Sequence, residues 1–392
     1  MPQAHIALTM PRLGLYGGAE GFGWRLAEAL AGQGHAVDFL CARAEGAPPA
    51  GVRVVELGRP PLGRALKNLW FARAVERRLA QSSYDLVFGM GRTWNQDILR
   101  VGGGPQSIFN RLTEAAYGEG LARVFKRLRR ALSPSAAVIG WMEARQFDRP
   151  AEPSQHGAQR SPQRIVCVSD LVRDWLLEAH PALDPARVSV IYNRPDLARF
   201  APLPPQRRQQ LRAAQGLADQ DILVCTAGTN FALKGVGTLI RALALLPPRF
   251  HLAVAGGRGP ERWLALAREL GVEGRVRFAG KVEDMPGFYG AADVFALPSY
   301  YDACSNAVLE ALACGLPAVS SARNGSAVFV PRRHVLEDPG DHQTLAALLQ
   351  SAADEARDAS RPAFTWPDDR PCGLQPYLDL VREVLAEKEA MP

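Results

Sequence analysis

Residues 5–41 read HIALTMPRLGLYGGAEGFGWRLAEALAGQGHAVDFLC, and this stretch decides how the chain begins to fold. The apolar run 5–10 predicts a β-strand, and the segment 14–21 that follows it is rich in glycine. Apolar residues then recur at helical spacing as far as Gly32, after which residues 35–41 predict a second strand. A strand, a glycine turn, a helix and a strand form a βαβ unit, in which the two strands are parallel and the crossover is right-handed.

The same alternation of strands and helices continues along the 392 residues and divides into two series. A polar, proline-rich stretch from Asn193 to about residue 219 separates them. We expect strands at 52–57, 85–89, 164–169 and 188–192 in the first series, and at 221–227, 250–255, 276–279, 294–297 and 317–320 in the second. We expect helices at 236–245, 260–270 and 306–313, and a last helix at 374–388. The pattern predicts an α/β protein of two domains with parallel sheets, whose carboxyl edges face a ligand cleft between the domains.

Composition places the chain among soluble globular proteins, with 47% hydrophobic and 22% charged residues. No apolar stretch is long enough to span a bilayer, and residues 1–10 are typical of a first strand rather than a signal peptide. The six cysteines form no C-x-x-C pair, and several lie in apolar runs, as buried free thiols do. We therefore expect a cytoplasmic protein that works in a reducing compartment.

The net charge is +6, and part of the excess is concentrated in residues 123–130, RVFKRLRR. This segment carries five cations with apolar residues at helical spacing, which suits contact with an anionic membrane surface. A solvated helix face is the alternative. Nucleic-acid binding is disfavoured because no helix-turn-helix, zinc-finger spacing or aromatic platform accompanies the charge.

The strongest candidate for chemistry is the segment 299–317, SYYDACSNAVLEALACGLP. Asp302 lies in the loop after the expected strand 294–297, and Glu310 follows seven intervening residues later, two turns inside the next helix. The helix start is suited to an anion, because its first N–H groups are free and its dipole is positive there. The residues at this start are the caps Ser305 and Asn306 and the amides of Asn306, Ala307 and Val308. The alternative is a capped helix with an exposed glutamate.

A second candidate is the loop 228–235, GTNFALKG, after the first strand of the second series. Its Lys234 ammonium suits a diphosphate, and Gly228 and Gly235 permit close approach of the backbone. Gly228 and Asn230 are included with Lys234 as donor-binding candidates. The loop is not a Walker motif, because Lys234 is followed by Gly235 and Val236 rather than by serine or threonine. A surface lysine without a function is the alternative.

Two weaker candidates lie in the first series. Gly17 and Gly18, in the turn before the first helix, could bring main-chain N–H groups to an anion, although the G-x-G-x-x-G spacing is missing. The segment 94–104, WNQDILRVGGG, is expected to be a loop that shapes an acceptor pocket. In this interpretation Glu20, Asp97 and Gly103 contact the acceptor, with Asp97 as general base if it reaches a hydroxyl. A capping or salt-bridged aspartate is the alternative.

Several kinds of chemistry are disfavoured. The seven histidines are scattered without metal-ligand spacing, and the sequence contains no Asp-x-Asp motif, so no metal is expected. A G-x-S-x-G nucleophile elbow is also missing, which argues against a triad hydrolase.

The pair Asp302 and Glu310, followed by Gly315-Leu316-Pro317, resembles the acidic pair of retaining family 4 glycosyltransferases of the GT-B fold. Supporting similarities lie at residues 17–20, 166–169, 190–193 and 231–235. The segments 96–104 and 307–325 are similar to enzymes of bacterial lipopolysaccharide core assembly.

The resemblance implies GT-B architecture, with two Rossmann-like domains facing across an interdomain cleft. Residues 1–193 would bind the acceptor, with the terminal helix of 366–392 packing back on them, and residues 194–365 would bind the donor. The implied reaction moves a hexose from a nucleoside-diphosphate sugar, uridine-linked, to a glycan or glycolipid, without a metal and with retention of configuration. The implied setting is lipopolysaccharide core or cell-surface polysaccharide synthesis, with residues 123–130 at the cytoplasmic face of the inner membrane.

The resemblance also implies roles for single residues. Glu310 would hold the donor ribose hydroxyls, and Asp302 a hydroxyl of the transferred sugar. Lys234, with the amides near Gly18 and Ala307, would stabilise the leaving diphosphate. No covalent nucleophile is assigned.

The sequence departs from the family pattern in two ways. Asp302 stands where glutamate is usual, and Thr229 and Leu233 stand at positions where many members carry a second cation, which Arg258 could replace. These departures keep two alternatives open: a non-catalytic scaffold that binds sugar nucleotides, or a sugar-nucleotide epimerase on the same fold.

Overall fold

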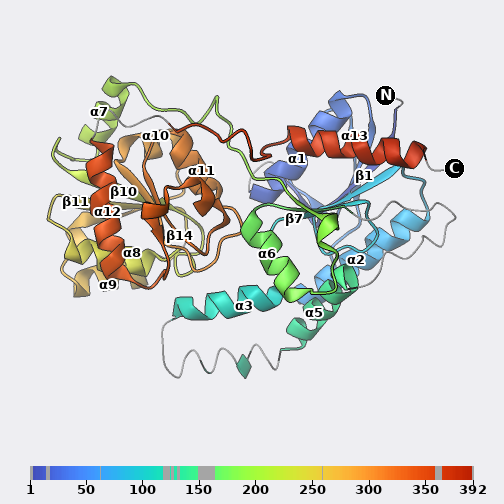
Figure 1. The fold of residues 1–392 in the computed structure, drawn as a ribbon, viewed down its shortest axis with the longest axis horizontal. Helices are drawn as coiled ribbons and strands as arrows, with labels where there is room; N and C mark the ends of the chain where they lie inside the picture. The colour runs from blue at the N-terminus through green and yellow to red at the C-terminus, as the bar shows by residue number, and fades with distance from the viewer. Residues whose placement is uncertain are drawn as a thin grey trace. The chain divides into compact units, whose positions relative to one another are not determined.

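The computed structural model describes residues 3–14, 18–61, 63–117, 124, 128–129, 133–148, 164–257, 259–357 and 364–390. The chain forms two compact units (Figure 1). Unit 1 consists of Met1–Phe109, Phe125–Tyr192 and Arg370–Pro392, and unit 2 of Asn110–Val124 and Asn193–Asp369. The chain therefore leaves unit 1 and returns to it for its last residues.

Unit 1 contains a parallel sheet of seven strands in the order β5-β3-β1-β6-β7-β8-β9. The strands are β1 (His5–Thr9), β3 (Ala36–Cys41), β5 (Val52–Glu56), β6 (Leu86–Gly89), β7 (Ile98–Val101), β8 (Arg164–Cys167) and β9 (Val188–Val190). A separate two-stranded ribbon pairs β2 (Arg12–Leu13) with β4 (Arg43–Ala44). From β1 the chain adds β3 and β5 on one side of the sheet, and from β6 it adds β7, β8 and β9 on the other. Ligands of open α/β sheets bind at such a switch point in strand order.

Helices cover both faces of this sheet because successive strand residues point to opposite sides. The helices of unit 1 are α1 (Gly18–Gly32), α2 (Arg64–Ala80), α5 (Pro134–Phe147), α6 (Asp170–Ala179) and α13 (Gln375–Glu389). A further helix, α3 (Gln106–Glu114), begins in unit 1 and ends in unit 2. Leu8 of β1 packs in one buried cluster with residues of α1 and α13, whereas its neighbour Ala7 packs in another with α2. The last helix, α13, lies beside α1 (Figure 1), where the rings of Phe22 and Tyr377 are 4.7 Å apart.

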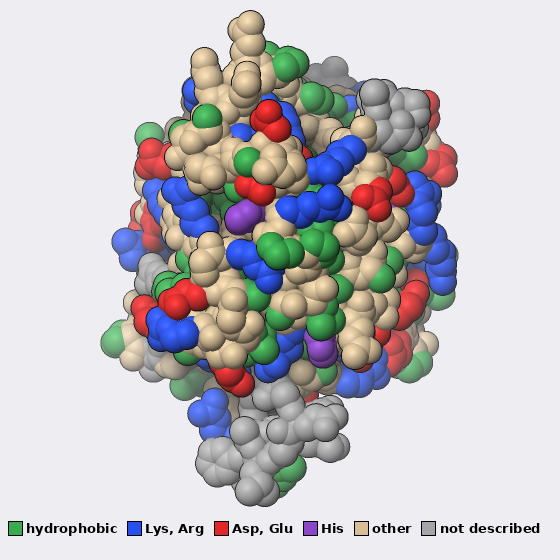
Figure 2. All heavy atoms as spheres, turned by 90° about the vertical axis from the view of Figure 1, so that its left-hand side faces the viewer, with side chains coloured by type: hydrophobic (Ala, Val, Ile, Leu, Met, Phe, Trp, Pro, Cys, Tyr) green, Lys and Arg blue, Asp and Glu red, His purple; other side chains and the backbone are tan. Residues whose placement is uncertain are grey.

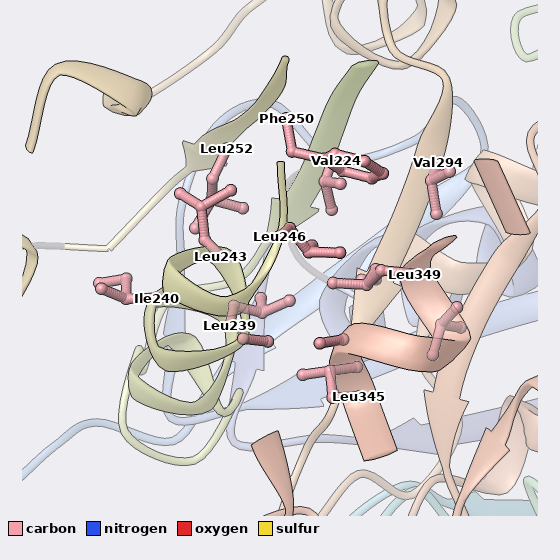
Figure 3. Close-up of a cluster of buried hydrophobic side chains, with 14 of the residues drawn as sticks. Val224, Leu239, Ile240, Leu243, Leu246, Phe250, Leu252, Val294, Leu345 and Leu349 are labelled. Carbon is pink, nitrogen blue, oxygen red and sulfur yellow. The ribbon is translucent and has the colours of Figure 1, made fainter. Parts of the chain in front are cut away.

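Unit 2 contains a parallel sheet of six strands in the order β12-β11-β10-β13-β14-β15. The strands are β10 (Ile222–Ala227), β11 (Phe250–Ala255), β12 (Val276–Gly280), β13 (Val294–Leu297), β14 (Ala318–Ser321) and β15 (Val335–Leu336). The helices are α7 (Pro205–Ala213), α8 (Val236–Leu245), α9 (Glu261–Glu269), α10 (Met285–Ala291), α11 (Asn306–Ala313) and α12 (His342–Ala356). Figure 3 shows leucines of α8 and α12 packed against Val224 and Leu252 of the sheet.

The predicted α/β class with two parallel sheets is confirmed. The prediction of a loop at 94–104 is wrong, because Ile98–Val101 is the strand β7, paired with β6 and β8. Ile98 and Leu99 are buried in the sheet, and the polar residues and glycines on either side of this short run obscured it. The short strands β2, β4 and β15 were not predicted.

The cysteines and the surface charges can be compared with the expectations from composition. All six cysteines are free, and five of them are buried. On the face drawn in Figure 2, cationic and anionic side chains are interspersed. Within the described ranges, every helix is too short or too polar to pass through a bilayer.

Candidate functional site

The loops at the carboxyl edge of the unit 2 sheet pack so closely that only glycine fits at several positions. Gly235 has φ +71°, and a Cβ there would lie 2.1 Å from the carbonyl oxygen of Pro298. Gly256 has φ +82°, and its Cβ would lie 2.7 Å from the carbonyl oxygen of Gly228. Left-handed backbone is costly for other residues, so these glycines fix the loops after β10, β11 and β13 against one another.

We expect Gly235→Ala to lower the free energy of unfolding by about 1–3 kcal/mol, because the added methyl meets backbone in a left-handed conformation. Urea unfolding of the purified chain measures this loss. Gly32→Ala is the matched control, since a Cβ at Gly32 meets nothing within 4 Å in helix α1. The control should be neutral or slightly stabilising, and equal stability of the two variants would contradict the packing argument.

Lys234 and Asp302 form an ion pair at this edge, in which the Lys234 ammonium donates to Asp302 Oδ2. Their side chains are only 22% and 12% exposed, so both charges are partly withdrawn from water. The two loops are tied together because the N–H of Tyr300 donates to the carbonyl of Leu233 at 2.8 Å. Asp302 is held further by its own N–H, which donates to the Arg323 carbonyl at 3.0 Å.

Glu310 lies on α11 and is partly buried, so the alternative of an exposed glutamate is wrong. The hydroxyl of Tyr289, on α10, donates to Glu310 Oε2 at 2.9 Å. Burial raises the pKa of Glu310, while the hydrogen bond from Tyr289 and the charge of Arg199 act to lower it. Burial, with the negative charge of Glu310, raises the pKa of Tyr289 well above its usual value, which keeps the phenol a hydrogen-bond donor.

The start of α11 is capped from within the protein. Ser305 Oγ accepts a hydrogen bond from the N–H of Val308 at 3.5 Å, and Val308 is buried. The prediction that the Val308 N–H is free for an anion is therefore wrong, because the cap uses it. The N–H groups of Asn306 and Ala307 donate to no protein acceptor within the described residues. These two amides remain suited to an anion.

Two asparagines hold this helix start in place. Asn193 Nδ2 donates to Asn306 Oδ1 at 2.9 Å and to the Cys304 carbonyl at 3.2 Å. Asn324 Oδ1 accepts from the N–H of Ser305 at 3.4 Å. No sequence pattern predicts a role in the site for Asn193, Tyr289 or Asn324. Asn193 is the last residue of the segment 190–193, which is similar to family 4 glycosyltransferases, so this similarity could have drawn attention to it. Nothing in the sequence indicates the contact of Tyr289 with Glu310.

The other candidates of the lysine loop have local roles. A Cβ at Gly228 would lie 2.7 Å from Cγ of Lys234, so Gly228 gives the lysine side chain its space. Asn230 Oδ1 accepts from the N–H of Leu233 at 3.3 Å and so shapes the turn that carries Lys234. Gly228, Asn230, Lys234 and Asp302 are thus brought together in unit 2.

The candidates in the first series lie in unit 1. Gly18 begins α1 and Glu20 is in its first turn, while Gly103 follows β7. Asp97 is buried, accepts from the N–H of Val87 at 2.8 Å and pairs with Lys388 at 2.9 Å. This geometry favours the salt-bridged alternative for Asp97.

Some sequence-based predictions cannot be placed. Gly17 and Arg258 lie outside the described residues, as does most of the basic segment 123–130. Among the residues that the structure does describe, no three histidine, cysteine, aspartate or glutamate side chains are grouped so as to hold a metal ion.

Two family models match the chain in succession. Residues 16–199 match the family described as Glycosyltransferase Family 4, and residues 207–363 match Glycosyl transferases group 1. The chain is 37% identical over 175 residues to the D-inositol 3-phosphate glycosyltransferase of Mycobacterium sp. (strain KMS). This alignment covers 43% of the chain and 39% of that protein, so the chain matches well under half the length of this curated relative.

Solved structures share the fold. The crystal structure of WaaG, a glycosyltransferase involved in lipopolysaccharide biosynthesis, gives a TM-score of 0.69 at 21% identity, over 92% of this chain and 96% of that one. The structure of HepE from Anabaena in complex with UDP and glucose gives a TM-score of 0.63 at 16% identity, over 98% and 100% of the two chains. At these identities the likeness concerns architecture.

Proposed function

Because the chain belongs to the GT-B glycosyltransferases of family 4, we propose that it transfers a hexose from a nucleoside-diphosphate sugar to a glycan or glycolipid, with retention of anomeric configuration. The observation that carries this proposal is the cluster at the carboxyl edge of unit 2. There a partly buried Lys234–Asp302 pair adjoins the loops that glycines fix, and Glu310 lies on the helix that follows.

Each group in the cluster has a chemical task in the proposed reaction. Tyr289 holds Glu310 Oε2 and leaves Oε1 to accept hydrogen bonds from the ribose hydroxyls of the donor. Lys234 and the amides of Asn306 and Ala307 stabilise the diphosphate as it leaves with negative charge. Asp302 keeps the Lys234 ammonium in position in the free protein and accepts from a sugar hydroxyl when the donor is bound.

The donor is a uridine-diphosphate sugar in this proposal, as UDP and glucose are the ligands of the HepE structure. Retention follows from attack on the same face of the sugar that the diphosphate leaves, and no side chain is assigned as a covalent nucleophile.

The acceptor belongs to lipopolysaccharide core or cell-surface polysaccharide synthesis, by analogy with WaaG. A cytoplasmic enzyme bound peripherally to the inner membrane through residues 123–130 would meet such an acceptor.

Binding of the donor should stabilise the protein. A ligand at 100 times its dissociation constant adds about 2.7 kcal/mol to the free energy of unfolding. We expect UDP to raise the melting temperature, and a thermal-shift series of UDP, GDP and ADP with their sugars checks this. If none of the diphosphates shifts the melting temperature, the proposed function fails. A shift without loss of the donor sugar over hours would indicate a scaffold, and isomerised donor without acceptor would indicate an epimerase.

A further inference from the structure

A cavity of about 470 Å³ lies at the carboxyl edge of the unit 1 sheet, beside the segments that follow β1, β3 and β5. This volume is within the range of small-molecule sites, and the carboxyl edge is where open α/β sheets bind ligands. The cavity is walled on one side by helix α2, which contributes Lys67, Trp70 and Phe71. The acceptor candidates Glu20, Asp97 and Gly103 do not line it.

The lining of this cavity is strongly cationic. Arg12, Arg43, Arg59 and Lys67 line it together with a single carboxylate, that of Glu45. Arg12 pairs with Glu45, and Nε of Arg43 lies 3.8 Å from the same carboxylate. Within the described residues Arg59 and Lys67 form no ion pair. The four cations of the lining therefore outnumber its one acid, although Glu20 also acts on Arg12 from outside the lining. A concave surface of one charge attracts the opposite charge.

The backbone holds two of these cations side by side. The short strands β2 and β4 pair in parallel, with Arg12 directly opposite Arg43. Like charges opposite one another on neighbouring strands are destabilising, and Glu45 can neutralise only one of them. A bound anion would remove the remaining repulsion. The planar arginine fork matches the oxygens of a phosphate, which it binds through two hydrogen bonds.

Part of the lining is apolar, and it comes from the same helix α2 that carries Lys67. Phe71 is buried in the core cluster beneath α2 and fixes the position of this helix. Trp70 is partly exposed, and its ring lies 3.6 Å from where a Cβ of Gly58 would be. Gly58 itself has φ +88°, a left-handed conformation that favours glycine next to the indole. The cavity thus offers a flat apolar surface beside a cationic one, which suits a ring or lipid body that carries an anionic group.

We propose that this cavity binds a phosphate group carried by the acceptor, with Arg59 and Lys67 as its principal ligands. The assignment to the acceptor rests on the proposed function, in which unit 1 binds the acceptor and unit 2 the donor. The phosphate has two possible sources, a soluble sugar phosphate and the headgroup of a lipid.

Isothermal titration calorimetry of the full chain tests the proposal in two comparisons. The first compares the affinity for glucose 6-phosphate with that for glucose. The second compares the affinity for vesicles of phosphatidylcholine that contain phosphatidylglycerol with that for vesicles of phosphatidylcholine alone. We expect the phosphorylated member of at least one pair to bind more tightly. Lys67→Gln and Arg59→Gln should each weaken that binding about tenfold, because each removes a hydrogen bond to a charged group. Arg73→Gln is the matched control, since Arg73 is exposed on the same helix and does not line the cavity.

Binding of the soluble phosphate or of the anionic vesicles supports the proposal and identifies the source. Preference for neither, or an equal loss in the Arg73 control, overturns it. UDP binding, measured on the same variants, should not change. If UDP binding falls in Lys67→Gln, the cavity serves the donor and the assignment to the acceptor is wrong. In a further outcome, UDP fails to bind the wild-type chain while the phosphate ligand binds as expected. That result would contradict the proposed function but would still show that the cavity of unit 1 binds a phosphate group.

Discussion

Glu310→Ala is expected to lower transfer by about 10²-fold or more while the protein remains folded. The carboxylate accepts from two ribose hydroxyls in the proposed complex, and a hydrogen bond to a charged group contributes about 1.5–3 kcal/mol. Loss of both therefore lowers kcat/KM by about 10²-fold or more. Steady-state assays with the donor identified by thermal shift measure this effect. Turnover within a few-fold of wild type would remove Glu310 from the donor site.

Glu310→Gln distinguishes a lost function from a lost fold. Burial raises the pKa of Glu310 in the folded protein, so the folded state binds more protons than the unfolded state above the ordinary pKa of glutamate. Its contribution to stability is therefore present at low pH and is lost as pH rises through the raised pKa. The glutamine does not ionise, so at neutral pH Glu310→Gln should be as stable as wild type or more stable, while transfer is still lost. A large fall in its melting temperature at neutral pH would indicate a structural role instead.

Lys234→Ala is expected to lower kcat by about 10²–10³-fold, the usual cost of removing one preorganised group that stabilises a leaving anion. The donor Kd should rise less, because the negative charge on the diphosphate grows as the bond breaks. Stopped or coupled assays of UDP release provide kcat, and calorimetry provides Kd. Lys281→Ala is the control, since that side chain is 90% exposed.

Lys234→Ala also leaves the carboxylate of Asp302 without its ion-pair partner. Because the Asp302 side chain is only 12% exposed, this unpaired charge is expected to lower the stability of the variant. The double variant Lys234→Ala/Asp302→Ala removes the uncompensated charge and should recover stability without recovering kcat. Turnover within threefold of wild type in Lys234→Ala would contradict the assigned role.

Much of the fold could be predicted because buried parallel strands are continuous apolar runs between turn signals. The expected strands 250–255 and 294–297 agree at both ends with β11 and β13, and the expected helices 236–245 and 306–313 agree with α8 and α11. The strand β7 was missed because four residues between polar and glycine-rich flanks are too few to show a pattern.

The candidate site could be predicted only where it is local in sequence. Asp302 and Glu310 are separated by one loop and about one helical turn, so their placement follows from the motif. Tyr289 lies 21 residues before Glu310 and reaches it from a different helix, a contact that no local pattern encodes. The phosphate cavity of unit 1 was missed for the same reason, because its cations come from four separate segments of the chain.

The position of α13 has a consequence for biosynthesis. This helix supplies buried side chains such as Tyr377 and Val381 to the core of unit 1, yet it follows unit 2 in the chain and leaves the ribosome after it. Unit 2 owes nearly all its residues to the continuous stretch Asn193–Asp369, so it can complete its core during translation. The sheet of unit 1, although synthesised earlier, keeps part of one apolar face uncovered until α13 has been synthesised. We therefore expect unit 2 to complete its folding before unit 1. A premature stop codon shortly before Gln375 would leave the core of unit 1 incomplete and dependent on chaperones.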